Sequence, residues 1–190
     1  MPRRWHGDPI RVARELWIGN GWRDTADAMS AVTSVLRVNQ LLSQRADAIL
    51  APIDLTFARY EVLVVLYFNA DGVPLSFLAD VLKLHQASIT NLVDKLEKQG
   101  YLERVKHPSD RRSTLARATR AGRARVRMAI KRLNAELFSQ LGLTEADLRT
   151  LTDILGKLRG ASGDAPVALE PGKEGGDASR ADLPVAQSSA

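Results

Sequence analysis

A cationic turn occupies residues 107–119, which read HPSDRRSTLARAT. Its centre is a Pro-Ser-Asp sequence followed by two adjacent arginines, Arg111 and Arg112. Guanidinium groups suit phosphate oxygens, which they bind through paired, charge-assisted hydrogen bonds. From Lys95 to Arg132 the chain holds thirteen bases and three acids, so the local charge is +10. A solvated basic helix face would explain such a run, but its clustering around a turn favours a polyanionic partner.

The residues around this turn do not have the spacing of a catalytic site or of a metal site. The acids near it are few: Asp94, Glu97, Glu103 and Asp110. Their spacings do not converge on one face, as an active site would require. The histidines lack the His-Glu-x-x-His spacing of a metal site: His6, His85 and His107. We therefore expect no metal and no cofactor, and the absence of cysteine excludes disulfides and thiol-based redox sensing.

Composition describes a globular chain with a polar C-terminal segment. Of 190 residues, 45% are hydrophobic and 26% are charged, which suits one domain with a buried core. Residues 160–190 are rich in Gly, Ala, Ser, Pro and Asp and lack apolar periodicity, so we expect a disordered tail. No apolar run approaches the ~20 residues that span a bilayer, and the basic N-terminus lacks a signal-peptide core. These features predict a cytoplasmic protein.

Helices are predicted for the first part of the chain. Asp8-Pro9 is a helix start, with a capping acid before a proline, and residues 1–24 are expected to form an N-terminal helical extension. Residues 25–50 carry apolar side chains at helical spacing, and a proline at position 52 ends that helix. Residues 56–68 are apolar nearly all round, which indicates a buried helix and leaves a strand as the alternative.

Two short helices and a hairpin follow, in the order of a winged helix. Residues 75–82 and 86–99 each carry an apolar stripe, and the short connection between them is typical of a helix-turn-helix. A plain helical hairpin in a bundle has the same spacing. Residues 101–106 and 113–119 then predict two short strands around the cationic turn, which favours the winged helix. Such a hairpin reaches toward a minor groove, whose negative potential attracts arginine.

The remaining apolar stripes exceed what one subunit can cover. They lie on the long helix 25–50, on a helix over residues 120–140 and on a last helix that Thr144 caps. A dimer formed through these helices would bury the surplus. Asn39 interrupts the first stripe, where it would either pair across the dimer axis or line a pocket. We expect the tryptophans near the N-terminus to pack the extra helix onto the dimer: Trp5, Trp17 and Trp22.

Three separated motifs resemble the MarR family of bacterial transcription regulators. They are LTFARYEVL at residues 55–63, HQASITNLVDKLEKQGYLER at 85–104 and HPSDRRS at 107–113. The resemblance covers roughly residues 25–159 and implies a mostly α fold, a winged helix-turn-helix with a small β-hairpin wing and a helical dimerisation region. It assigns dimerisation to helices at about 25–51 and 120–159, and DNA binding to a lobe at about 56–119.

The same resemblance implies the residues that would touch DNA. Base and phosphate contacts would come from the first turns of the second short helix: Gln86, Ala87, Ser88, Thr90 and Asn91. Lys95 would contact the backbone, and His85 would be a helix cap or a phosphate contact. In the wing, Asp110 would brace the turn while Arg112, beside Arg111, enters the minor groove. Ser88 and Thr90 are also common at helix starts for structural reasons alone.

Two departures from the family pattern stand inside the matched region. Gln86 occupies a position where proline is frequent, and ARATRAG at residues 116–122 replaces a Leu-Thr pair followed by an acid. The second change makes the exit of the wing more basic, which bears on DNA affinity rather than on the fold.

The function implied is that of a homodimeric repressor that binds a palindromic operator in double-stranded DNA and is released by a small molecule. Without cysteine, the signal would be a non-covalent ligand. Asn39, Phe57 and Tyr60 offer aromatic walls, an amide and a phenol, which suit a small aromatic or amphipathic anion. The first alternative is a non-specific or architectural DNA-binding protein. The second, with less support, is a nucleic-acid-processing enzyme.

Overall fold

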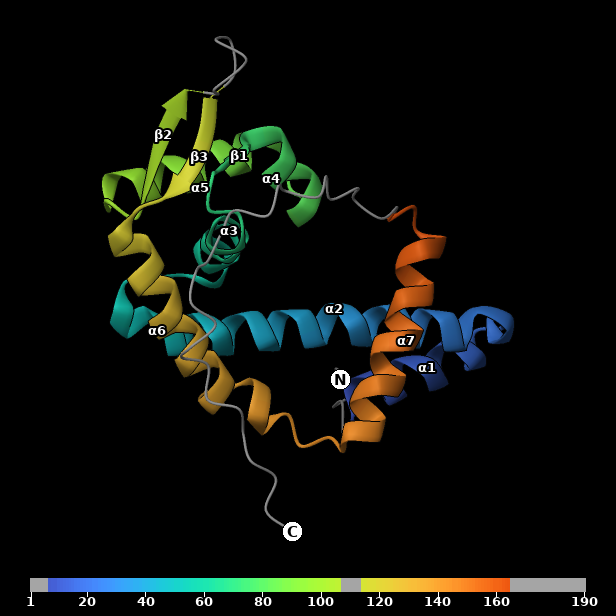
Figure 1. Cartoon of the computed structure of the whole chain (residues 1–190). Coiled ribbons are helices and arrows are strands. Elements are labelled where there is room, and N and C mark those ends of the chain that lie inside the picture. The colour runs from blue at the N-terminus through green and yellow to red at the C-terminus, as the bar shows by residue number, and fades with distance from the viewer. Residues whose placement is uncertain (1–6, 107–113, 165–190) are drawn as a thin grey trace, which may run out of the picture. The chain divides into compact units, whose positions relative to one another are not determined.

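The computed structural model describes residues 7–106 and 114–164 (Figure 1). These residues belong to two compact units, one extending through Leu143 and the other beginning at Thr144. The first unit contains the N-terminal helices, a three-stranded sheet and the helices that pack against it. The second unit contains the last helix.

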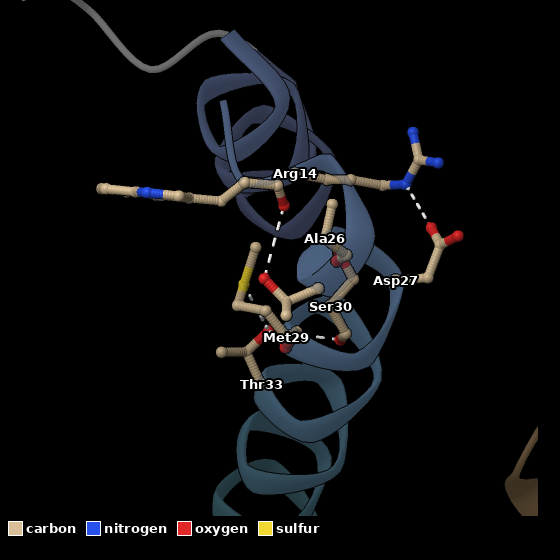
Figure 2. A network of polar contacts seen from close by, with 8 residues as sticks. Arg14, Ala26, Asp27, Met29, Ser30 and Thr33 are labelled. Carbon is tan, nitrogen blue, oxygen red and sulfur yellow. Dashed lines mark hydrogen bonds and ion pairs between the residues drawn. The ribbon is translucent and has the colours of Figure 1, made fainter. Parts of the chain in front are cut away.

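α1 (Pro9–Gly19) and α2 (Arg23–Leu50) form a helical hairpin. Figure 2 shows the Arg14 side chain reaching the carboxylate of Asp27, to which its Nε donates at 2.7 Å. The rings of Trp17 and Trp22 meet edge to face at the turn, with 4.8 Å between their centroids. The extension predicted from Asp8-Pro9 is therefore confirmed as a helix, and these two tryptophans hold it against α2. The packing predicted for Trp5 lies outside the described residues.

A tight turn connects α2 to the central helix of the first unit. The 3-10 turn η1 (Ala51–Ile53) follows α2 directly, and α3 (Phe57–Phe68) begins four residues later. Two side chains satisfy two of the free N–H groups at the start of α3: the Thr56 hydroxyl accepts from the Arg59 N–H, and the Asp47 carboxylate accepts from the Phe57 N–H at 2.6 Å. This double cap settles the ambiguous apolar segment as a helix.

The helix-turn-helix is formed by α4 (Leu75–Leu82) and α5 (Gln86–Lys98). Lys83 takes a left-handed conformation with φ of 52°, and its N–H donates to the Ala79 carbonyl, which ends α4. The short connection then reverses the chain before α5, as the spacing predicted.

The sheet has three strands, one more than the sequence predicted. β2 (Leu102–Lys106) pairs antiparallel with β3 (Thr114–Ala118), and the register places Leu102 opposite Ala118. β1 (Val73–Pro74) pairs with the other edge of β3, so the order is β1-β3-β2. β1 escaped prediction because two residues ending in proline show no alternation. The β2–β3 hairpin projects from the side of α3 that faces away from α2 (Figure 1).

α6 (Arg120–Glu136) is shorter than predicted. The expected helix continued to Gln140, but the structure ends it at Glu136 and continues with the 3-10 turn η2 (Phe138–Gln140). Arg45 of α2 explains the break, since its guanidinium donates to the Glu136 carbonyl at 2.5 Å and to the Gln140 carbonyl at 3.4 Å. A distant cation thus satisfies carbonyls that would otherwise lack partners at the helix end.

The core of the first unit lies around α3. Leu50 at the end of α2, Leu63 and Leu66 of α3, Val93 of α5 and Leu133 of α6 are all fully buried. Outside this core, α2 leaves a row of large apolar side chains exposed, among them Val32 at 51%, Val35 at 39% and Leu36 at 58%. The sequence predicted such a surplus. Across the described ranges, no helix combines the length and the apolar character needed to cross a membrane.

α7 (Glu145–Ala161) forms the second unit. Its start is the predicted capping box: the Thr144 hydroxyl accepts from the Asp147 N–H at 3.2 Å, and the Asp147 carboxylate accepts from the Thr144 N–H at 3.2 Å. The helix extends two residues past the predicted boundary at residue 159. Its apolar row, which included Leu151, Ile154 and Leu158, remains 42–56% exposed in the single chain.

Candidate nucleic-acid interface

The first turns of α5 present a polar face to solvent. Every residue predicted there to contact DNA is exposed: His85, Gln86, Ala87, Ser88, Thr90, Asn91 and Lys95. The opposite face is buried, with Ile89, Val93 and Leu96 at 0% exposure. Burial on one face therefore fixes how the polar face is directed.

The N-terminus of α5 keeps hydrogen-bonding capacity for a ligand. His85 takes the N-cap position, and its side chain makes no capping hydrogen bond. Backbone N–H groups in the first turn of a helix lack carbonyl partners within it and attract phosphate. The Thr90 hydroxyl donates to the Gln86 carbonyl at 2.9 Å, and its oxygen keeps acceptor lone pairs for a ligand.

An arginine joins the wing to α5. Arg104 of β2 donates to the Asp94 carboxylate at 2.5 Å and also bonds the carboxylate of Glu97, one turn later on α5. The hydrogen bond with Asp94 is the largest cause that raises the pKa of Arg104; burial opposes it, and the charge of Glu97 adds to it. In the sequence these two acids stand out only as poor catalytic candidates. An acid pair at i and i+3 followed by a strand arginine was the available signal.

A second ion pair crosses the wing itself. Glu103 and Arg117 face each other in the β2–β3 register, and Arg117 donates to one Glu103 oxygen at 2.9 and 3.0 Å. The hairpin remains paired as far as Lys106 and Thr114. The tip residues Asp110, Arg111 and Arg112 lie outside the described residues.

The base of the wing meets α6 without intervening side chains. The Thr119 N–H donates to the Tyr101 carbonyl at 3.1 Å, and the Thr119 hydroxyl donates to the Gly100 carbonyl at 2.7 Å. A Cβ placed on Gly122 would lie 1.8 Å from the Tyr101 oxygen, so only glycine allows this approach. The basic exit of the wing is thereby attached to the end of α5.

A polar helix face beside a basic hairpin is the geometry of a winged-helix DNA-binding lobe, and comparison with known proteins agrees. A sequence profile described as "MarR family" matches residues 55–114. The chain also resembles the crystal structure of Sco5413, a MarR family transcriptional regulator from Streptomyces coelicolor, at 36% identity with a TM-score of 0.66. That similarity covers 73% of this chain and 96% of the other. The chain belongs to the MarR family. It is a DNA-binding transcriptional regulator.

Crystal structures of two other similar proteins include a bound partner. The multiple antibiotic resistance protein MarR of Escherichia coli is 27% identical over 142 residues, which cover 72% of this chain and 98% of that protein. A MarR variant complexed with operator DNA matches with a TM-score of 0.66 at 26% identity, over 70% of this chain and 96% of the other. CouR from Rhodococcus jostii RHA1, bound to p-coumaroyl-CoA, matches with a TM-score of 0.61 at 29% identity, over 72% and 92%.

The predicted effector residues are only partly brought together. The rings of Phe57 and Tyr60 lie 5.7 Å apart on α3. Asn39 is exposed on α2, eight residues before the Asp47 side chain that contacts Phe57, which is about 12 Å along a helix axis. Burial raises the pKa of Tyr60, and the neighbouring charge of Glu61 raises it further. Burial also raises the pKa of Glu61, a half-buried acid that sequence reasoning did not select.

Proposed function

We propose that this MarR-family chain is a homodimeric repressor that binds a palindromic operator and leaves it when a small molecule binds. The observation that carries the proposal is the double ion pair of Arg104 with Asp94 and Glu97. It holds a wing strand against the helix whose opposite end is polar and exposed. A rigid lobe of this kind can place a helix in one groove and a hairpin over the next at the same time.

Within each lobe we assign the contacts residue by residue. Gln86, Ala87, Ser88, Thr90 and Asn91 contact base edges and nearby phosphates, and Lys95 with His85 contacts the backbone. Asp110 braces the wing, while Arg111 and Arg112 reach the minor groove. These roles follow the family resemblance. The exposure of the α5 residues supports them.

The dimer is proposed from the apolar rows that a single chain leaves exposed. They lie on α2 and, separately, on α7, within the regions 25–51 and 120–159 that we assign to dimerisation. Exposed apolar rows of this length on helices are typical of subunit interfaces. In the dimer the two α5 helices would address successive major grooves, about 34–36 Å apart.

Release by an effector is proposed from the aromatic pair on α3, in which Tyr60 is buried and Phe57 half-buried, and from the relatives. CouR has been crystallised with p-coumaroyl-CoA, which is an anionic compound with an aromatic group. Phe57 and Tyr60 offer aromatic contacts next to the start of α3, which Asp47 of α2 caps. A ligand there would touch the junction between the dimerisation helix and the DNA-binding lobe.

DNA selection with the full chain tests the repressor proposal. Duplexes recovered from a random library should share an inverted repeat, and Arg112→Ala should weaken binding to them by about 1–3 kcal/mol and reduce the salt dependence by about one ion. Asp110→Ala should also weaken binding, although it removes a repulsive charge. Arg11→Ala, at an exposed position on α1, serves as the control. Equal affinity for unrelated duplexes would instead support an architectural binder.

Light scattering tests the dimer. Ile154→Asp places a charge in the exposed row of α7 and should yield monomers that bind the selected duplex weakly. Arg149→Asp adds an acid to the polar face of the same helix and should leave the dimer intact. A folded wild-type monomer that binds the full palindrome tightly would contradict the proposal.

A further inference from the structure

The side chain of Gln99 connects the end of α5 to the turn that follows α2. Gln99 is the C-cap of α5, and its amide nitrogen donates to the Asp54 carbonyl at 2.9 Å and to the Asp54 carboxylate at 2.7 Å. Its amide oxygen accepts from Arg59 at 2.8 Å. Only this orientation of the amide is favourable, because the reversed one would set its oxygen against two oxygens and its N–H₂ against a guanidinium.

The backbone at Asp54 is shaped to receive these bonds. Asp54 has φ of 53°, a left-handed conformation that few residues other than glycine, asparagine and aspartate adopt. Its N–H donates to the Ala51 carbonyl at 3.0 Å and closes the η1 turn. The carbonyl and the carboxylate of Asp54 both meet Gln99. The turn after α2 therefore presents two acceptors to the end of α5.

A second connection closes a ring of contacts around the same turn. Arg125 of α6 donates to the Ile53 carbonyl at 2.9 Å, and its guanidinium lies 4.9 Å from the ring centroid of Tyr101. Tyr101 follows Gln99 by two residues and is bonded through its carbonyl to Thr119. Residues 53–54 and 99–101 are thus joined directly by Gln99 and indirectly by Arg125.

This ring lies where the proposed dimerisation helix passes into the DNA-binding lobe. We propose that Gln99 is a positioning residue that fixes the direction of α5 relative to α2, and through it the spacing between half-sites that the dimer accepts. The inference rests on the proposed dimeric function. Gln99 lies thirteen residues after Gln86, at the opposite end of α5 from the residues assigned to DNA. It can therefore alter the placement of the lobe without altering the reading of bases.

Half-site spacing is a sensitive measure of this role. One base pair added between half-sites moves the second site by about 3.4 Å and rotates it by roughly 35°. A dimer with a fixed angle between α2 and α5 can accept few such changes, whereas a loosened lobe can follow them. Loss of the Gln99 bonds should consequently broaden the accepted spacing while the preferred half-site sequence stays the same.

The experiment is a selection with the full-length chain on a library of random inverted repeats separated by spacers of every length from zero to six base pairs, a design range of about half a helical turn. Wild type should recover one dominant spacer. Gln99→Leu should recover the same half-site with neighbouring spacers, and the preference for the best spacer over the next should fall by about tenfold, as expected for lost bonds to charged partners. Gln99→Glu keeps the size of the side chain but sets a carboxylate against Asp54, so it should behave like Gln99→Leu.

Two further variants separate positioning from general stability. Asp54→Asn keeps an acceptor and tolerates the left-handed backbone, so it should retain the wild-type spacer. Arg11→Leu changes an exposed residue of α1, outside the regions assigned to dimerisation and to DNA, and it should leave the profile unchanged. Uniformly weaker binding to every spacer by both Gln99 variants would overturn the inference. So would a wild-type profile that is flat across spacers, whereas failure to recover any inverted repeat would overturn the proposed function itself.

Discussion

The guanidinium of Arg104 lies 2.5 Å from the Asp94 carboxylate and also bonds Glu97, so one strand of the wing is ion-paired to two turns of α5. All three side chains are 29–48% exposed, so solvent screens their attraction. The consequence for stability is therefore modest. The consequence for DNA binding is larger, because the hairpin and the helix must meet neighbouring grooves together.

Arg104→Met should lower the free energy of unfolding by about 1 kcal/mol and weaken binding to the selected operator by about 1–3 kcal/mol. Denaturant titration and DNA titration on the same preparation measure the loss of stability and the loss of DNA affinity. Arg149→Met removes an exposed i,i+4 pair with Glu145 on α7 and should change neither. A loss of stability with unchanged DNA affinity would mean that the ion pair acts only on folding.

Gly122→Ala should destabilise the protein by about 2 kcal/mol or more, because the new Cβ would lie 1.8 Å from the Tyr101 carbonyl oxygen. The new Cβ would meet only backbone atoms of Tyr101, and no side chain can rotate away to relieve the clash. Gly160→Ala is the matched control, since nothing lies within 4 Å of its Cβ position on α7. That change should stabilise by about 0.5 kcal/mol through helix propensity. Thermal melts that shift in opposite directions would confirm the contrast.

Local rules predicted most of the fold, and long-range contacts account for what they missed. Caps at Asp8 and Thr144 and apolar periodicity located the helices. The early end of α6 depends on Arg45, which lies 91 residues before the carbonyl it bonds most closely. The ring around Gln99 joins residues 40 and 45 positions apart, and no local pattern marks such a contact. The exposed face of α5 could be predicted, because Ile89 and Val93, four residues apart, bury the opposite face of the helix.

Glu61→Gln should make stability less dependent on pH. Burial raises the pKa of the folded-state Glu61 carboxyl above its ordinary value of 4.5, so the folded chain holds this proton more tightly than the unfolded chain. Wild-type stability is therefore lost as pH rises from that ordinary value through the raised one. The glutamine variant carries no such proton. Its free energy of unfolding should exceed that of wild type near pH 7, and the difference should shrink toward about pH 4.

Urea titrations across this range measure the effect of Glu61. Glu15→Gln, at an exposed position on α1, is the matched control for loss of one negative charge. If the gap between wild type and Glu61→Gln widened as the pH fell, the folded-state pKa of Glu61 would not be raised.

The effector prediction concerns the aromatic pair on α3. An aromatic acid that contacts Tyr60 should bind the free dimer more tightly than the operator-bound dimer, with a coupling of about 1–3 kcal/mol, or roughly 5–150-fold. By reciprocity, operator DNA must lower the affinity of the dimer for the acid by the same factor. Glu61 is the neighbour whose charge acts on Tyr60, so an anionic effector should bind more tightly to Glu61→Gln.

Calorimetric titration of aromatic acids, with and without operator, measures this coupling. Tyr60→Phe removes the phenol while preserving the buried ring, which a truncation to alanine would not. Tyr67→Phe, farther along α3 with its ring under Arg123, is the control. Asn39 lies about 12 Å along α2 from Asp47, which caps α3. An acid whose affinity also falls in Asn39→Ala must therefore be long enough to span that distance. If neither operator DNA, nor Tyr60→Phe, nor Glu61→Gln changes the affinity of the acid, the effector binds elsewhere.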